Sequence, residues 1–172
     1  MKGRKSNAIV AQGIQILLNL DHRGARGSEV NSGDGAGVLI QTPDAFFRAT
    51  TTLDLPPVGG YGVGMVFLPQ DATARTACET GIERIVREEG QEVIGWRTVP
   101  TSGETLGETA RSSQPCVRQV FIGRGPAVRD LQAFERKLYV IRRRAEHDLR
   151  HAEWAPGAET FYICSLSART LV

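Results

Sequence analysis

Cysteine is scarce in this sequence of 172 residues, and the three that occur lie far apart. Cys78, Cys116 and Cys164 form no Cys-x-x-Cys pair, and their number is odd. This usage favours reduced thiols in a cytoplasmic protein. Cys164 lies inside an apolar run, so we expect a small core residue there rather than a nucleophile.

Long apolar runs are also absent, so the sequence predicts no membrane span. The first six residues are basic, but no leader-like apolar stretch follows, and we expect no signal peptide. A net charge of +2 is too small to indicate nucleic acid or an anionic membrane as a partner. With 41% hydrophobic and 23% charged residues, the composition is typical of a folded domain, and we expect one domain over residues 1–172.

The pattern of apolar residues, caps and breakers predicts a mixture of helices and strands. Helices are predicted over residues 8–20, 44–48, 74–89 and 130–151. Strands are predicted over residues 38–41, 61–68, 92–99, 117–122 and 161–166, and residues 101–113 are expected to be an exposed loop. Because these elements alternate irregularly and no repeat is visible, the pattern favours a layered α/β or α+β sandwich over a doubly wound sheet.

The first helix carries a wide apolar stripe, from which we expect deep packing. It is followed by a corner, Asp21-His22-Arg23-Gly24, where Gly24 suits a left-handed C-cap and the two cations suit the last turn. A glycine-rich turn, Ser32-Gly33-Asp34-Gly35-Ala36-Gly37, then leads into a β-branched run. Two chain reversals that carry short charged groups are typical either of a salt-bridged joint or of the floor of an active site.

Four separated motifs resemble, in their order, the glutaminase domain of the glutamate synthase large subunit, a class II glutamine amidotransferase. The motifs are His22-Arg23-Gly24-Ala25, the glycine-rich turn, residues 134–142 (Phe-Glu-Arg-Lys-Leu-Tyr-Val-Ile-Arg) and residues 161–170 (Phe-Tyr-Ile-Cys-Ser-Leu-Ser-Ala-Arg-Thr). The resemblance implies an α+β fold, the four-layer αββα sandwich of N-terminal-nucleophile hydrolases. It also implies hydrolysis of glutamine, with the ammonia used to aminate 2-oxoglutarate.

The same resemblance assigns roles to residues of the corner. Arg23 is expected beside the nucleophilic cysteine, where its charge would favour the thiolate, while His22, Gly24, Gly33, Asp34 and Gly35 would support the site. His22 is not needed as a general base, because in this class the α-amino group of the nucleophile takes that role. In the ordinary interpretation, Arg23 caps carbonyls and pairs with a carboxylate, and Asp34 stabilises its turn.

The resemblance also implies parts that these residues do not contain. The nucleophile would be a cysteine at the start of the mature protein, and an oxyanion-hole Asn-Gly pair and a glutamine-binding arginine would follow Val172. We therefore expect a domain incomplete at both ends that has no glutaminase activity by itself. FMN, an iron–sulfur cluster and a small reductase subunit or ferredoxin would belong to the whole enzyme, with no cofactor held here.

Alternatives from other classes remain open at this point. One is a non-catalytic scaffold or regulatory module with the same fold, and another is an RNA-binding domain that uses the basic helix at residues 136–150. The usual interpretation of that helix is a solvated face with i,i+4 pairs, because no aromatic residues interleave for base stacking. His147 and His151 are expected to be a surface pair rather than a zinc site, and the glycine-rich turn lacks the strand-before, helix-after setting of a phosphate loop.

Overall fold

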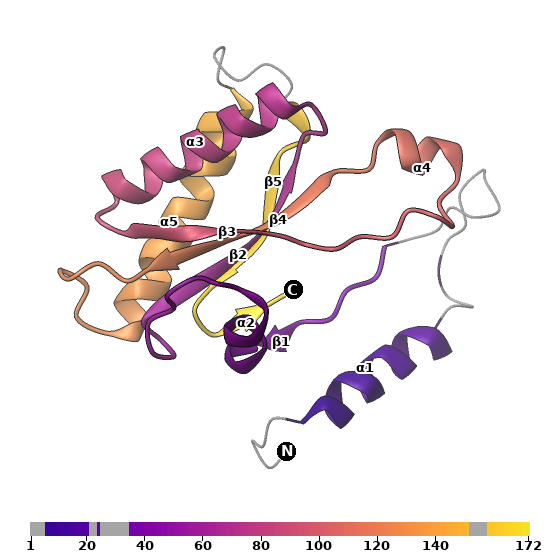
Figure 1. Ribbon diagram of the computed structural model, residues 1–172, viewed down its shortest axis with the longest axis horizontal. Helices are drawn as coiled ribbons and strands as arrows, with labels where there is room; N and C mark the ends of the chain where they lie inside the picture. Colours follow the sequence, from indigo (N-terminus) through magenta and orange to yellow (C-terminus); the bar gives the residue numbers. More distant parts are fainter. Residues whose placement is uncertain (1–5, 21–23, 25–34, 152–157) are drawn as a thin grey trace. The chain divides into compact units, whose positions relative to one another are not determined.

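The structure is a computed structural model that describes residues 6–20, 24, 35–151 and 158–172 (Figure 1). The chain divides into two compact units. The first comprises the described parts of residues 1–40 with residues 102–114 and 172, and the second comprises residues 41–101 and 115–171. Mixed helices and antiparallel strands confirm the predicted α+β character.

The first unit contains two helices, α1 (Asn7–Asn19) and α4 (Glu108–Ser112). Helix α1 begins where predicted, because Ser6 is its N-cap and the Ser6 hydroxyl accepts a bond from the Ala8 N–H at 3.1 Å. Helix α4 is the single helical feature in the segment predicted to be a loop, and none of its residues is buried.

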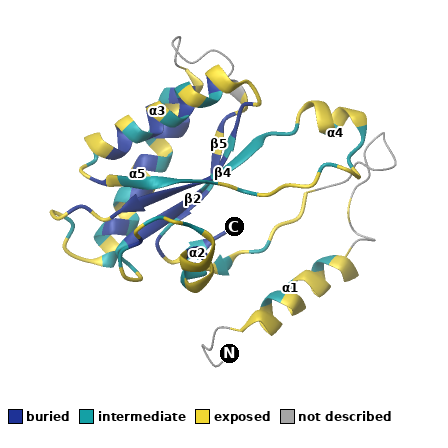
Figure 2. Ribbon diagram, in the orientation of Figure 1, coloured by how far each residue is buried: buried dark blue, intermediate teal, exposed yellow. Residues whose placement is uncertain are grey.

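The prediction that α1 packs deeply is wrong for the described structure. None of its residues is buried, and Ile9, Ile16 and Leu18 are 58%, 58% and 64% exposed (Figure 2). A wide apolar stripe indicates that a helix is suited to pack against a partner, but the stripe does not identify that partner.

The second unit is built on a four-stranded antiparallel sheet. Its strands are β2 (Tyr61–Leu68), β3 (Glu92–Thr98), β4 (Cys116–Gly123) and β5 (Tyr162–Ser167), in the order β3-β4-β2-β5. All four were predicted to within about two residues, the usual uncertainty of an element end. The pairing of β2 with both β4 and β5 places it in the middle of the sheet, consistent with its nearly complete burial.

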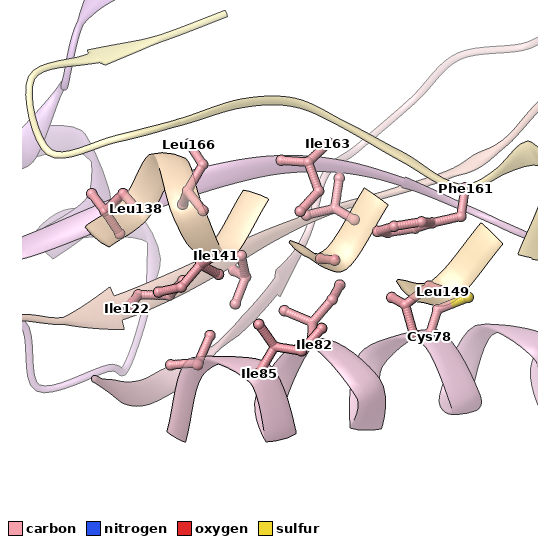
Figure 3. Packing of buried hydrophobic residues seen from close by; sticks show 14 of the residues in the cluster. Cys78, Ile82, Ile85, Ile122, Leu138, Ile141, Leu149, Phe161, Ile163 and Leu166 are labelled. Carbon is pink, nitrogen blue, oxygen red and sulfur yellow. The ribbon is translucent and has the colours of Figure 1, made fainter. Parts of the chain in front are cut away.

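Two helices, α3 (Ala72–Glu88) and α5 (Leu131–Arg150), cover one face of this sheet (Figure 1). Their N-caps are Asp71 and Asp130, whose carboxylates accept bonds from Ala74 N–H and Ala133 N–H. Figure 3 shows the core between the layers, where apolar side chains of both helices meet those of the strands. The labelled residues are Cys78, Ile82, Ile85, Ile122, Leu138, Ile141, Leu149, Phe161, Ile163 and Leu166.

The short helix α2 (Asp44–Thr50) packs on the opposite face of the sheet. Phe47 is fully buried, and its ring meets that of Phe121 edge-on, with 5.0 Å between the centroids. The neighbouring Phe46 is 48% exposed, because successive helical positions point about 100° apart and only one of the two rings can face the sheet.

Two further strands are minimal. β1 (Ile40–Gln41) and β6 (Thr170–Leu171) pair in a two-stranded sheet, and a 3₁₀ turn, η2 (Ala158–Thr160), precedes β5. The strand expected over residues 38–41 is therefore shorter than predicted, and it is not buried. β6 was not predicted, because two residues carry too little pattern to identify a strand.

Ion pairs join α3 to α5 across the helical layer. Arg144 contacts Glu88 and Glu89, and the Lys137 ammonium lies 2.8 Å from Glu89. Hydrogen bonds from Lys137 and Arg144 lower the pKa of the Glu89 carboxyl. The basic run of the long helix is thus only partly a solvated face, since Arg144 ties two helices together.

Within the described segments, no helix is both long enough and hydrophobic enough to cross a membrane.

Candidate functional site

Of the predicted site residues, Gly24 and Gly35 are described, whereas Arg23, His22, Gly33 and Asp34 lie outside the described residues. Helix α1 ends at Asn19, and its C-cap is Leu20, whose N–H bonds the carbonyls of Ile16 and Leu17. The last turn of α1 carries no basic residue. The expectation that Gly24 caps this helix, with cations in its last turn, is therefore wrong, because the helix closes earlier on its own carbonyls.

The glycine-rich turn is described from Gly35 onward. Among the described residues, a Cβ atom added at Gly35 would meet nothing within 4 Å, and one added at Gly37 would lie 3.6 Å from Val172 Cγ1, an ordinary contact. The described surroundings of these two positions therefore leave room for a side chain.

The strand after this turn is hydrogen-bonded to the end of the fourth family motif. β1 begins three residues after Gly37, and β6, at the end of the fourth motif, pairs with it. The Thr42 N–H donates to the Arg169 carbonyl at 2.9 Å and extends the connection. Segments separated by more than a hundred residues in the sequence are therefore paired at this point.

The third and fourth motifs are joined more firmly, through Glu135 of α5. Its carboxylate accepts bonds from the Ser167 hydroxyl at 3.0 and 3.1 Å and from the Ala168 N–H at 2.8 Å. The Ser167 oxygen in turn accepts a bond from the Arg169 N–H at 2.9 Å. Sequence reasoning missed Glu135, because its partners are more than thirty residues away and nothing local marks a glutamate as their acceptor.

A second polar network, partly buried, lies where α2 meets the sheet. The Tyr61 hydroxyl donates to Asp44 at 2.9 Å, and Arg48 binds Asp44 as well as the carbonyls of Leu55 and Pro56. Burial, followed by the bond to Asp44, raises the pKa of the Tyr61 hydroxyl. Because its raised pKa keeps this hydroxyl protonated near neutral pH, Tyr61 is not suited to act as a general base. We therefore interpret this network as support for the loop between α2 and β2.

The three thiols occupy separate elements, and none lies at a chain terminus. Cys78 of α3 is fully buried, and burial raises the pKa of its thiol to about 11. Cys116 of β4 and Cys164 of β5 are partly buried. Cys164, expected in the core, is thus less enclosed than Cys78. As internal residues, none of the three has the free α-amino group that the resemblance implies for the nucleophile.

His147 and His151 are paired at the C-terminal end of α5. Their rings lie 5.3 Å apart between centroids, and the Nδ1 atom of His147 lies 3.1 Å from the Asp148 carboxylate. Among the described residues there is no group of three or more His, Cys, Asp or Glu side chains placed to hold a metal ion.

With the fold and these motifs in place, comparison with known proteins identifies the class. A family model described as glutamine amidotransferases class-II matches residues 1–172. The chain belongs to the class-II glutamine amidotransferases.

Within this class, the chain is similar to the large chains of glutamate synthases. It is 47% identical to the NADPH glutamate synthase large chain of Bacillus subtilis, over 100% of this chain. It is 36% identical to ferredoxin-dependent glutamate synthase 2 of Synechocystis, over 100% of this chain, and 35% identical to the NADPH large chain of Azospirillum brasilense, over 99%. The chain spans 11% of the length of each of these relatives.

Proposed function

We propose that residues 1–172 form part of the glutaminase domain of a glutamate synthase. In this role the parent enzyme hydrolyses glutamine to glutamate and ammonia, and uses the ammonia to aminate 2-oxoglutarate. The observation that carries the proposal is the family match over residues 1–172, together with 47% identity to a glutamate synthase large chain.

The proposed chemistry is nucleophilic catalysis by an N-terminal cysteine outside these residues. Its thiolate forms a C–S bond to the amide carbon of glutamine, its α-amino group passes the proton to the leaving nitrogen, and ammonia departs. Water then cleaves the thioester, which releases glutamate and restores the thiol. In this scheme Arg23 stabilises the thiolate, and His22, Gly24, Gly33, Asp34 and Gly35 hold the corner.

We also propose that the complete domain is a four-layer αββα sandwich, of which these residues form an incomplete part. The sheet of the second unit supports this arrangement, because α3 and α5 cover one face and α2 covers only part of the other. That other face also carries three side chains that are not fully buried, those of Met65, Phe67 and Tyr162. The Phe67 and Tyr162 rings stack at 4.7 Å and present a flat apolar surface against which a second sheet could pack.

Among the described residues no group of three or more His, Cys, Asp or Glu side chains could ligate an iron–sulfur cluster. An iron–sulfur cluster requires several converging cysteine thiolates, and the three cysteines here lie on separate elements. We propose that FMN and the iron–sulfur cluster are held by other domains of the large subunit. A small reductase subunit or ferredoxin would supply electrons, and the proposed location is the cytoplasm.

A polypeptide of residues 1–172 should release no ammonia from glutamine, because loss of the nucleophile alone costs about four or more orders of magnitude in rate. The measurement is ammonia release by the purified chain, with circular dichroism to establish that it is folded. Appreciable hydrolysis by the folded chain would overturn this part of the proposal.

The role of Arg23 is testable in a chimera in which these 172 residues replace the matching segment of the Bacillus subtilis large chain. Arg23→Ala should lower glutamine-dependent activity by about a hundredfold or more, if the guanidinium stabilises charge at the nucleophile. Arg87→Ala, which removes an exposed arginine on α3, is the matched control and should leave activity unchanged. Equal activity of the two variants would contradict an active-site role for Arg23.

A further inference from the structure

The outer side of the α5 N-terminus carries a hollow that the proposed glutaminase role does not use. Its volume is about 470 Å³, and it lies between the turn after β4 and the first turns of α5. The side chains around it are apolar or basic apart from one aspartate. The residues that matter are Val128, Arg129, Ala133, Arg136, Lys137 and Val140.

The two arginines of this hollow are unusual because they lack partners. Neither Arg129 nor Arg136 makes a side-chain hydrogen bond or ion pair with any part of the chain that the structure describes, and both are exposed. The later cations of α5 are all engaged. Arg142 and Arg143 bind Glu146, and Arg144 binds Glu88 and Glu89.

The remaining charges at the hollow are already neutralised or occupied. The Lys137 ammonium lies 2.8 Å from the Glu89 carboxylate. The Asp130 carboxylate accepts a bond from the Ala133 N–H at 2.7 Å as the N-cap of α5. The hollow therefore presents two unsatisfied guanidinium groups, whose planar forks suit carboxylates.

The frame of the hollow is formed in advance. The Gly125 N–H donates to the buried Gln91 side chain at 2.9 Å, and the Val128 N–H donates to the Gly125 carbonyl at 3.1 Å. A Cβ atom at Gly125 would collide with the Gly90 carbonyl oxygen, so this turn lies directly against the end of α3. A preformed site loses less conformational entropy when a partner binds.

We propose that this hollow is a docking site for an acidic segment of another protein domain. Carboxylates of that segment would bind Arg129 and Arg136, and an apolar side chain between them would rest against Val128, Ala133 and Val140. This proposal does not depend on the glutaminase role.

Protein is a better occupant than RNA. None of the described residues that line the hollow is aromatic, so these residues offer no platform for base stacking. Nucleic-acid binding without sequence preference depends on many contacts between cations and phosphates, and this hollow offers only two unpaired cations from the described segments. The apolar lining of Val128, Ala133 and Val140, in contrast, matches the anchor residue of a peptide.

The test is fluorescence anisotropy of a labelled peptide, Glu-Asp-Glu-Leu-Phe-Glu-Asp-Glu, titrated with the purified chain at low ionic strength. Binding should weaken as salt rises, and R129E/R136E should raise Kd by about tenfold or more. The control R84E/R87E makes the same charge change on α3, at exposed arginines whose partners are Glu88 and Glu83, and should leave Kd nearly unchanged. Thermal unfolding of both variants establishes that they fold.

A second peptide tests the apolar contact. Replacing its central Leu-Phe with Ser-Ser should weaken binding to the parent chain by about tenfold, a typical cost of losing an apolar anchor. The proposal is overturned if the parent chain does not bind the acidic peptide, or if R129E/R136E and R84E/R87E bind it equally. Tighter binding of a uridine oligonucleotide, lost in R129E/R136E, would also overturn it and would assign the surface to nucleic acid.

Discussion

Gly62 shows at the residue scale how closely α5 lies on the sheet. A Cβ atom at this position would come within 2.5 Å of Leu138 Cδ1 and 3.2 Å of Leu138 Cδ2. The layer that lies over the sheet here is α5, and its nearest atom belongs to a buried leucine. Glycine is required here because a side chain would have no room. The backbone conformation is not the reason, since Gly62 is not among the glycines with positive φ.

Gly62→Ala should therefore destabilise the protein by about 1–3 kcal/mol, the usual cost of adding a methyl group to a filled core. Urea denaturation measures the change. Gly13→Ala in α1 is the control, because its added Cβ would make only an ordinary contact with Val38 at 3.8 Å. That variant should be neutral or more stable by up to about 1 kcal/mol, since alanine favours helix. Equal stability of Gly62→Ala and the parent would show that the two layers are less tightly packed than described.

Cys78 provides a second prediction at the residue scale. Alkylation requires the thiolate, and a buried thiol with a pKa of about 11 is almost entirely protonated at pH 8. In the folded protein, iodoacetamide should modify the partly exposed Cys116 and Cys164 and leave Cys78 unmodified until urea unfolds the chain. Peptide mass spectrometry after timed quenching gives the rate at each site. Modification of Cys78 as fast as Cys164 under native conditions would contradict the described core.

At the scale of elements, the positions of most helices and strands in the sequence could be predicted, whereas the packing of these elements against one another could not. The caps Asp71 and Asp130 depend on local sequence, because each carboxylate accepts a bond from the N–H three residues later. The burial of α1 was predicted wrongly from an equally clear local pattern. The difference is physical: caps and periodicity are local, whereas burial depends on what lies opposite the helix.

Glu135 is the clearest contact between elements that the sequence did not reveal. It accepts a bifurcated hydrogen bond from the Ser167 hydroxyl and a second bond from the Ala168 N–H, and so fixes the turn between β5 and β6 to α5. Glu135→Ala should cost about 1–3 kcal/mol, since it leaves a partly buried N–H and hydroxyl without their acceptor. Gln132→Ala, one turn earlier, is the control with little expected effect, because the Gln132 side chain accepts a long bond of 3.3 Å from the exposed Arg169. Thermal unfolding of the two variants distinguishes them, and equal melting temperatures would show that the turn holds without Glu135.

At the scale of the whole molecule, the family was predictable and the arrangement was not. Four motifs in order were sufficient to identify the glutaminase resemblance, which the family match then confirmed. The strand order β3-β4-β2-β5 and the pairing of β1 with β6 join segments remote in sequence, which no local pattern encodes. Of the predicted site, Arg23 and Asp34 remain predictions, because they lie outside the described residues.

The most direct test of the central claim compares two activities of the Bacillus subtilis chimera that carries these 172 residues. Glutamate formation is measured once with glutamine as nitrogen donor and once with ammonia supplied directly, which bypasses the glutaminase. If these residues are a glutaminase segment, both activities should persist, and the Arg23→Ala chimera should lose only the glutamine-dependent one. Loss of glutamine-dependent activity in the unmutated chimera, with ammonia-dependent activity intact, would contradict the account.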